Sequence, residues 1–529
     1  QASDSFKLNY GVRLDGLFFD NRDLMRNQAI YDLTYHSTSK GGAETHIDTG
    51  KWPGAQIAVS PRIGFNWDVL GDKSLTLRGG TGLFVGRLPL VFFTNMPTNS
   101  GMVQYQAQIG PSTKYANLPD AVKANYASVD DILAQFNKAN GGMVTDVKAL
   151  TAKLQEMGFP STINPEDGTK PSSISAVDPK FKMPQVWKTS LAIDYSFPTN
   201  FPFSISAEGI YNKMVNAVCI SDWSIPNAAG FAKFNGADNR PIYYSGYRTG
   251  TSAFVLENTH KGYGWSAVAE IKISPINGLD IKASYTHTVN KEITGMPGSA
   301  AESAFTYVPT VNGPNHIQLH NSQYVTPDRF VLSANLRNKC GDTFSVIYET
   351  WRGGYNYSFM MTNDMNGDGY NYDALYIPTD EQVNNNEFRF VSNDDRDRFM
   401  AYVHKDKYLS RHQGQYAEAY SVYNPWVHRI DLRYTHDFKL KIGNSTNVLR
   451  LEANLKNAAN LLHSTWGIAK TMNSAIEDGR ILKYEGVDAE GYPTFSTPKA
   501  VSGSLETFQP LHAVGQCWYA SIGIKYMFN

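Results

Sequence analysis

The stretch CWYASIGIKYMF, residues 517–528, alternates strictly between two kinds of side chain. The even positions are apolar and are aromatic at the ends, from Trp518 to Phe528, whereas the odd positions are mixed and carry the charge of Lys525. Successive side chains of a β-strand point to opposite faces, so this pattern indicates a strand with one apolar and one wet face. We therefore predict a strand over 513–528 whose even residues 518–528 face lipid.

The same alternation recurs along the whole chain. Phe330, Leu332 and Leu336, for example, alternate with polar or small residues. Twelve strands are expected, at about 5–19, 56–69, 74–87, 185–197, 203–220, 251–274, 279–291, 327–338, 343–359, 426–438, 446–459 and 513–528. Five short turns rich in Gly, Pro, Asn and Asp alternate with six long loops. The long loops are expected at roughly 20–55, 88–183, 221–250, 292–326, 353–424 and 460–512.

The composition excludes several classes of protein. Charged residues make up 18% of the 529 residues, hydrophobic residues 42% and aromatic residues 13%. This hydrophobic content excludes a disordered chain, and the balance of 48 basic against 49 acidic residues gives no field that favours nucleic acid. Three cysteines are too few for a disulfide framework. No apolar stretch is long enough for a transmembrane helix, which leaves a large soluble β protein or a membrane β-barrel.

The loop lengths favour the membrane barrel. A soluble sandwich also alternates, but it does not sort its connections into alternating short turns and very long loops. We therefore predict an all-β, transmembrane antiparallel barrel in the bacterial outer membrane, with short periplasmic turns and long extracellular loops. The loop at 88–183 is the largest, and amphipathic stretches within 119–158 predict two helices there. The strand at 251–274 is too long for one span and is expected to continue above the membrane.

Closure of the barrel requires a further prediction, because an open edge in hydrocarbon leaves backbone groups unpaired. Long loops of this size are typical of 22-stranded barrels with a plugged lumen. The chain also begins within a strand, at Phe6–Leu14. We expect residues 1–529 to be the C-terminal part of such a barrel, with about ten strands and a plug preceding them. The alternative is a barrel closed by these twelve strands alone, with 5–19 paired to 513–528.

Several motifs resemble TonB-dependent outer-membrane receptors. They include LNYGVRLD at 8–15, SPRIGFNWD at 60–68 followed by LRGGTGLFVGR at 77–87, and FKMPQVW at 181–187. Further matches are NTHKGY at 258–263, VNGPN at 311–315, DMNGDG at 364–369 and KYLSRHQGQYAE at 407–418, and the aromatic end of the last strand resembles the signal read by the barrel-insertion machinery. The combination is similar to the Oar-like branch, which is related to SusC-type transporters of Bacteroidetes.

This resemblance implies energy-coupled transport rather than catalysis. It implies that a plug, absent from residues 1–529, engages the TonB system. A surface lipoprotein of the SusD type, membrane lipid and lipopolysaccharide are further partners that the resemblance suggests. We predict uptake of an oligomeric nutrient, a peptide or a glycan, and no enzymatic activity. A protein-export or adhesin-like barrel and a passive porin-like pore are the alternatives.

The loop at 353–424 contains a candidate calcium site. Oxygen-bearing side chains alternate at Asp364, Asn366 and Asp368, followed by Tyr370 and Asp373. Calcium takes six to eight oxygen ligands, and loops of this type supply side chains at positions 1, 3 and 5 and a backbone carbonyl at position 7, here Tyr370. Asp373 would close the site. The alternative is a solvated Asn/Asp/Gly turn, because the EF-hand glutamate and the flanking helices are missing.

Other candidate residues are weaker. Charged residues of both signs line the predicted inner face, and we expect them to pair with one another or with a plug. These are Arg62, Asp68, Arg78, Lys188, Asp194, Asp431, Arg433, Arg450, Glu452 and Lys456. Ligand contacts are expected from aromatic residues of the long loops. The candidates are Tyr105, Tyr115, Tyr243, Tyr244 and the run Tyr355–Phe359.

Overall fold

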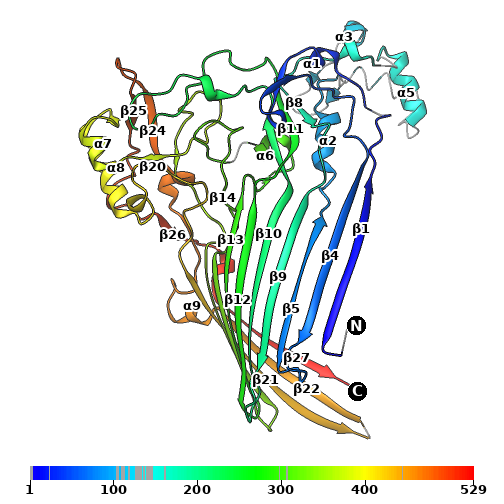
Figure 1. Cartoon of the computed structure of the whole chain (residues 1–529), viewed down its shortest axis with the longest axis vertical. Coiled ribbons are helices and arrows are strands. Elements are labelled where there is room, and N and C mark those ends of the chain that lie inside the picture. Colours follow the sequence, from blue (N-terminus) through cyan, green and yellow to red (C-terminus); the bar gives the residue numbers. More distant parts are fainter. Residues whose placement is uncertain are drawn as a thin grey trace.

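A computed structural model shows one large antiparallel sheet with long loops gathered at one end (Figure 1). It describes residues 4–22, 24–102, 106–108, 114–116, 120–125, 131, 134, 138, 147–159, 163–296, 298–305, 308–443 and 445–528. The main path of the sheet contains twelve strands, each hydrogen-bonded to the next strand of the path along the chain. In order they are β1 (Phe6–Leu17), β4 (Gln56–Asp68), β5 (Leu75–Val85), β9 (Gln185–Ser196), β10 (Phe203–Asp222), β12 (Tyr263–Ile276), β13 (Leu279–Glu292), β15 (Asp328–Arg337), β16 (Asp342–Arg352), β21 (Val427–Ile442), β22 (Ser445–Lys456) and β27 (Tyr519–Met527).

Three expected strands differ from the structure. The strand expected over 513–528 begins only at Tyr519, because Val514–Gln516 form a 3-10 helix. The segment 251–274 is not one strand: β11 (Ser252–Thr259) and β12 are separated at Gly262, which has φ +120°. Both of them pair with β10, whose upper half extends beyond the wall, and β8 (Ser173–Val177) adds to β11 in parallel. The segment 343–359 is also shorter than expected, because two consecutive glycines in positive-φ conformations, Gly353 and Gly354, turn the chain away after Arg352.

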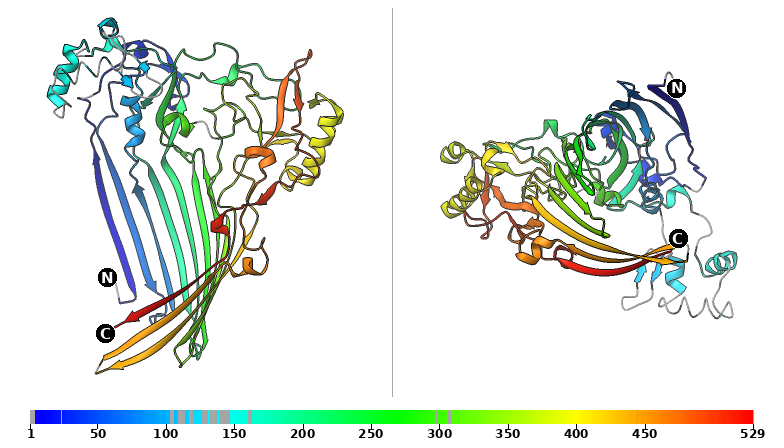
Figure 2. Two further views of the ribbon diagram at one scale, coloured as in Figure 1. Left: turned by 180° about the vertical axis from the view of Figure 1, so that it is seen from behind. Right: turned by 90° about the horizontal axis from the view of Figure 1, so that it is seen from below.

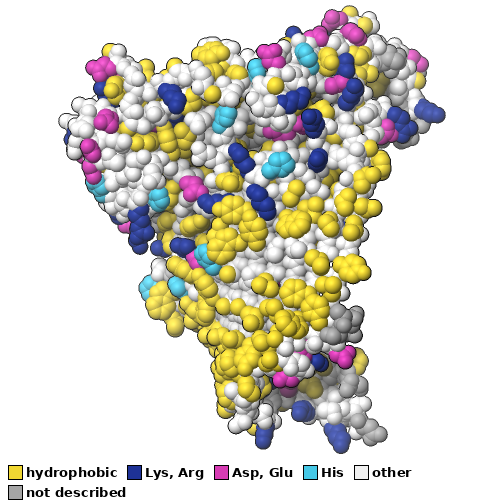
Figure 3. Space-filling view, in the orientation of Figure 1, with side chains coloured by type: hydrophobic (Ala, Val, Ile, Leu, Met, Phe, Trp, Pro, Cys, Tyr) yellow, Lys and Arg dark blue, Asp and Glu magenta, His cyan; other side chains and the backbone are white. Residues whose placement is uncertain are grey.

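The apolar side chains of the strands share one face of the sheet. The register between β22 and β27 places Ile522 opposite Ala453 and Ile524 opposite Leu451. Ile522 is 80% exposed and Tyr10, at the other end of the path, is 83% exposed. Hydrophobic side chains cover this outer face along the strands (Figure 3). Exposed apolar side chains in a continuous belt are unfavourable in water and favourable in lipid, so this face is suited to a bilayer.

The sheet is curved, and both of its ends are open among the described residues. Figure 2 shows the strands as a curved wall, with helices α7 (Asp380–Asn384) and α8 (Asn393–Lys405) beyond its convex side. The path begins at β1 and ends at β27, and no ladder in the described part of the chain joins these two strands. The pairing of 5–19 with 513–528 that a closed twelve-strand pore requires is therefore not formed in this structure.

The remaining elements lie mostly at the end of the sheet with the long connections, which we call the long-loop end. The helices are α1 (Gln28–Tyr31), α2 (Val91–Thr98), α3 (Asp120–Asn125), α5 (Val147–Glu156), α6 (Ala301–Phe305) and α9 (Ala458–Leu462). The 3-10 helices are η1 (Thr38–Lys40), η2 (Pro165–Asp167), η3 (Ala228–Gly230), η4 (Leu409–Arg411), η5 (Ser474–Gly479) and η6 (Val514–Gln516). The short strands are β2 (Tyr35–Ser37), β3 (Ala43–Thr45), β6 (Gln106–Gln108), β7 (Lys114–Ala116), β14 (His320–Asn321), β17 (Met360–Met361), β18 (Tyr376–Ile377), β19 (Arg389–Phe390), β20 (Gln415–Tyr416), β23 (Lys470–Met472), β24 (Arg480–Val487), β25 (Pro493–Ser496) and β26 (Phe508–Pro510). Much of the expected 119–158 helical region lies outside the described residues, apart from α3, α5 and three single positions.

Residues 353–424 and 468–512, which we call the loop domain, fold together around one hydrophobic core. Parallel pairing of β17 with β24 and of β19 with β25 interleaves the two segments. Phe359, Phe399 and Phe495 are fully buried in this core. The two loops, which the sequence analysis treats as separate, are therefore one folded unit. Among the described residues, no helix is both long enough and apolar enough to cross a membrane.

Candidate ligand site

A cavity lined by tyrosines lies in the loops at the long-loop end. Its volume is about 450 Å³. Five tyrosine side chains contribute to its wall, namely Tyr324, Tyr355, Tyr357, Tyr372 and Tyr420. Polar residues complete the lining, among them Gln323, Asn356, Ser358 and Asp478. Concave sites of this size with aromatic walls and a few polar groups are typical of small-ligand binding.

The turn after β16 positions two of these tyrosines. A Cβ atom on Gly353 would lie 2.7 Å from Cδ of Pro327 and 2.8 Å from the carbonyl oxygen of Val325, so this tight turn requires glycine. Tyr355 and Tyr357 follow this turn, and their ring centroids are 5.0 Å apart. The hydroxyl of Tyr357 is 2.7 Å from Oγ1 of Thr471, and this contact joins the two segments of the loop domain.

The tyrosines combine accessible ring area with neutral hydroxyl groups. Tyr324 is 57% exposed and lies 5.8 Å from Tyr355, centroid to centroid, in an edge-to-face arrangement. Burial raises the pKa of Tyr355 and of Tyr420, and neighbouring tyrosines add to both effects. Both hydroxyls therefore remain protonated at neutral pH and are able to donate as well as accept hydrogen bonds. Such a wall stacks on rings and binds hydroxyl or amide groups.

The cavity contains some of the expected aromatic residues and omits others. Tyr355 and Tyr357 line it, whereas Phe359 of the same run is buried in the core of the loop domain. Tyr243 is also buried, and its hydroxyl donates to the carbonyl of Asn312 at 2.9 Å. Tyr244 is exposed and packs on Phe231 outside the cavity. Tyr105 lies outside the described residues, as does the side chain of Tyr115.

Three lining tyrosines were missed by sequence reasoning. Tyr324 comes from the loop expected at 292–326, and Tyr372 and Tyr420 come from the loop at 353–424. Tyr372 lies inside the candidate calcium motif, whose carboxylates predict metal binding rather than an aromatic contact. Their aromatic character in long loops was the only available signal, because no spacing along the chain connects them.

The Asp364–Asp373 motif forms a compact turn in the structure. The two carboxylate oxygens of Asp364 accept hydrogen bonds from the backbone N–H groups of Gly367 and Gly369, both at 2.8 Å. Oδ1 of Asn366 accepts from the N–H of Asp368 at 2.9 Å, and Oδ1 of Asp368 accepts from the N–H of Tyr370 at the same distance. These are the local side-chain bonds that Asx turns form.

A buried arginine, Arg240, forms an ion pair with Asp373. This residue was not identified in the sequence analysis. Arg240 is fully buried and donates to Asp373 Oδ1 at 2.9 Å and to Asp238 Oδ2 at 2.8 Å. The other oxygen of Asp373 accepts from the N–H of Met365 at 2.7 Å. Two buried carboxylates and one guanidinium thus lock the motif to residues 238–240. Asp373 already has its partners.

Asp368 differs from Asp373, because its carboxylate has no basic partner among the described residues and accepts from the N–H of Tyr370. Burial raises the pKa of Asp368, and the nearby carboxylates of Asp373 and Asp364 raise it further. A buried carboxylate in this position gains from a proton or from a cation. Across the described ranges, however, no group of three or more His, Cys, Asp or Glu side chains lies close enough together to hold a metal ion.

Seven of the ten charged side chains expected on the inner face of the sheet form ion pairs in the structure. Arg78 donates to Asp194 at 2.9 Å and to Glu208 at 3.1 Å. Three further pairs join Arg433 with Glu452, Lys456 with Asp431, and Arg450 with Asp437, at 2.6 Å each. Arg62 and Lys188 instead lie over the ring of Phe84, and Asp68 caps the turn that follows β4. The inner wall is therefore polar, and most of its described charges are neutralised by pairing.

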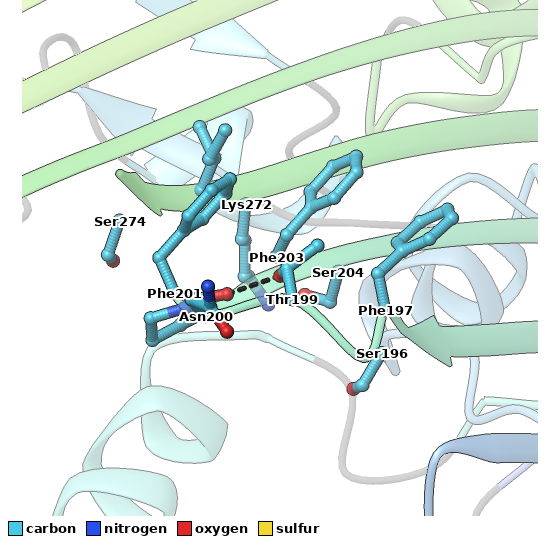
Figure 4. Close-up of a pocket in the computed structure, with 11 residues that line it drawn as sticks. Ser196, Phe197, Thr199, Asn200, Phe201, Phe203, Ser204, Lys272 and Ser274 are labelled. Carbon is cyan, nitrogen blue, oxygen red and sulfur yellow. Dashed lines mark hydrogen bonds between the residues drawn. The ribbon is translucent and has the colours of Figure 1, made fainter. Parts of the chain in front are cut away.

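A second hollow lies at the opposite, short-turn end of the sheet. It has a volume of about 600 Å³ and surrounds the turn between β9 and β10 (Figure 4). Phe197 and Phe203 stack there with centroids 4.3 Å apart, and Tyr195 meets Phe197 edge to face. Tyr195 pairs with Ile205 and Phe203 with Ile273 on the outer face, and Phe197 directly follows the end of β9. This hollow is therefore part of an aromatic belt at a membrane interface rather than a ligand site.

Taken together, an antiparallel wall with an apolar outer face, a polar paired inner face and aromatic residues at the turn end defines an outer-membrane β-barrel protein. The family described as "Outer membrane beta barrel domain" matches residues 1–483. The chain belongs to this family of outer-membrane proteins. No curated protein matches the sequence significantly.

Solved structures that match this chain include an outer-membrane transporter and two receptors. The outer membrane transporter YddB from Escherichia coli is 10% identical with a TM-score of 0.40, and the match covers 90% of this chain and 41% of that one. A ferric enterobactin receptor (PfeA) mutant from Pseudomonas aeruginosa is 8% identical with a TM-score of 0.36, covering 89% and 40%. The siderophore receptor PirA from Acinetobacter baumannii is 8% identical with a TM-score of 0.33, covering 77% and 37%. The chain thus spans less than half the length of these proteins.

Proposed function

We propose that this chain forms part of the barrel of a TonB-dependent outer-membrane transporter that takes up an oligomeric nutrient, a peptide or a glycan. The tyrosine cavity carries this proposal, because it is a built concave site among the loops at one end of an outer-membrane barrel domain. Rings and neutral hydroxyls suit a ligand that is rich in hydroxyl or amide groups and poor in charge.

In this proposal the long loops are extracellular and the short turns periplasmic, which is the usual arrangement of bacterial outer-membrane barrels. The free edges of β1 and β27 would pair with further strands, to give a 22-stranded barrel around a plug that contacts the TonB system. The motifs at 60–68 and 77–87 support the Oar-like, SusC-related branch, and with it a SusD-like lipoprotein partner.

Uptake by the producing cell tests this function. Cells expressing the Tyr355→Ala protein would be given a fluorescently labelled tryptic digest and, separately, a labelled pool of mixed oligosaccharides. Loss of one stacking ring is expected to weaken uptake of one of these pools by about fivefold. Tyr244→Ala is the matched control, because Tyr244 is an exposed loop tyrosine outside the cavity.

Energy coupling separates a transporter from a passive pore. Uptake should stop when the proton-motive force is dissipated, and it should stop when TonB is deleted. Uptake that continues under both treatments would favour a porin-like pore. Uptake of neither labelled pool, with normal surface exposure of the protein, would favour an adhesin-like or export barrel instead.

We also propose that the Asp364–Asp373 turn takes up a structural calcium ion. Side-chain oxygens of Asp364, Asn366 and Asp368 and the carbonyl of Tyr370 are the ligands. The support is the buried Asp368, whose pKa is raised by burial and whose charge has no basic partner within hydrogen-bonding distance among the described residues. Calcium would hold the loop in one conformation beside the tyrosine cavity, which Tyr372 also lines.

A further inference from the structure

A large pocket opens beneath the loop domain on the outer side of the sheet. Its volume is about 860 Å³, and it lies between the end of β16, the start of β21 and the segment that contains η4. Arg352 belongs to its lining and stands in the register of Phe344, Val346 and Tyr348, which is the lipid-facing register of β16. Trp426, immediately before β21, is 44% exposed at the same place. The pocket therefore borders the apolar belt.

The side chains of this pocket carry unbalanced positive charge. Five basic residues line it, namely Arg352, Lys405, Lys407, Arg411 and Lys470, against three acidic ones, Asp406, Glu418 and Glu506. Figure 3 shows Lys and Arg side chains along the lower border of the loop domain, directly above the hydrophobic outer face. An excess of cations at the edge of an apolar belt attracts anionic groups in the same plane.

All three acidic side chains already have partners. Glu506 is 2.7 Å from Lys405, and Glu418 pairs with Lys291. Asp406 accepts from the N–H groups of Tyr408 and Leu409, at 2.9 and 3.0 Å, and from the hydroxyl of Thr507. Arg352 is neutralised separately by Asp328 at 2.7 Å.

Three cations of this lining, Lys407, Arg411 and Lys470, form no ion pair among the residues that the structure describes. Of these, Lys407 and Arg411 are both exposed. They flank Tyr408, whose ring stacks on His412 with the centroids 4.2 Å apart. Lys407 and Arg411 thus lie beside the stacked rings of Tyr408 and His412, in a pocket that Trp426 also lines. This combination suits a ligand that carries phosphate groups on an apolar body.

We propose that this outer pocket binds the phosphorylated headgroup of an outer-leaflet lipid, with Lys407 and Arg411 contacting the phosphate. The inference rests on the proposed function in one respect, namely that the long-loop end faces the outside. The lipid would fill the gap under the overhanging loop domain and so hold this domain, which carries Tyr357 and Tyr372 of the tyrosine cavity, in a fixed position above the barrel wall.

Binding to defined nanodiscs tests the proposal. The protein purified from its own outer membrane would be exchanged into phosphatidylcholine nanodiscs with or without diphosphorylated lipid A, and bound lipid A would be counted by native mass spectrometry. Each basic side chain near an anionic lipid contributes about a fivefold change in binding, so Lys407→Gln with Arg411→Gln should weaken it about thirtyfold. Lys180→Gln with Lys499→Gln is the matched control, because both lysines are exposed and lie outside the pocket.

Each outcome has one meaning for the proposal. Equal binding of lipid A by the wild type and the Lys407/Arg411 double variant overturns it. Displacement of lipid A by millimolar inorganic phosphate also overturns it, since the pocket would then take a soluble anion. The single variants, each expected to lose about fivefold, show the effect if the double variant folds poorly. Failure of the proposed uptake function is seen separately, as an unchanged uptake by the Tyr355→Ala protein.

Discussion

The substitution Ile522→Arg provides a quantitative test of the outer face. Ile522 lies near the middle of β27, is 80% exposed and pairs with Ala453 on the apolar side of the wall. An arginine near the bilayer midplane on the lipid face of a barrel costs about 2–4 kcal/mol. The middle of that range corresponds to roughly a 150-fold loss in the ratio of folded to unfolded protein.

Ser521→Arg is the matched control on the opposite face. Asn454 Nδ2 lies 3.4 Å from Ser521 Oγ, and Glu452 is paired with Arg433 on the same side. An added arginine there enters a polar wall, so we expect a cost below about 1 kcal/mol. Both variants would be refolded into phospholipid vesicles, and the folded fraction would be measured by heat-dependent gel mobility and by urea titration. Equal losses for the two variants would refute the assignment of the faces.

Three further predictions address the loops and the orientation. Cys340 is exposed in the turn between β15 and β16, which the proposal places on the periplasmic side. A membrane-impermeant maleimide should therefore modify it only after the cells are permeabilised. Peptide mapping would separate this modification from that of Cys517, and modification of Cys340 in intact cells would reverse the proposed orientation. Arg240→Met should loosen the 364–376 region by about 3–5 kcal/mol in hydrogen exchange, because it leaves Asp238 and Asp373 buried and unpaired; unchanged protection would contradict the buried-pair account. Calcium should slow hydrogen exchange of the same region in the wild type but not in Asp368→Asn, and no effect of calcium on the wild type would leave the motif as a turn only.

In the absence of calcium, we also expect Asp368→Asn to remove a pH response of this loop. The folded-state pKa of Asp368 is raised by burial, so the protonated form is favoured in the folded loop. The stability that this group contributes is present at low pH and is lost as the pH rises through the raised pKa. In calcium-free buffer the wild-type loop should therefore loosen with increasing pH, whereas the asparagine variant should not.

The strands could be predicted from the sequence because their pattern is local. Residues two apart in a strand share a face, so the apolar residues Ile522, Ile524 and Tyr526 predict which face of β27 is turned toward lipid. The single long strand expected at 251–274 is interrupted for an equally local reason: residues 260–262 separate β11 from β12. Both parts still pair with β10 in the same register, with Thr259 opposite Ala217 and Tyr263 opposite Lys213. Turn chemistry at Gly262 was the missing signal.

The loops could not be predicted in the same way, because their contacts are distant in sequence. Arg240 and Asp373 are separated by 133 residues, yet they form a buried ion pair. Tyr324, Tyr355 and Tyr420 meet in one cavity only after β16 has turned at Gly353 and the loop domain has packed around Phe359. No periodic pattern in the sequence predicts such contacts, because the conformation of each loop depends on its packing against other loops.

The Asp364–Asp373 motif illustrates how the two kinds of information combine. Its spacing is local and predicts either a calcium loop or an Asx-rich turn, because both use Asp364 to bind the N–H groups at Gly367 and Gly369. The structure adds a distant fact: Arg240 neutralises Asp373 and leaves Asp368 as the buried carboxylate without a basic partner among the described residues. The charge of Asp368 therefore decides between the two alternatives. A proton on that carboxylate corresponds to the turn, and a cation beside it corresponds to the calcium loop.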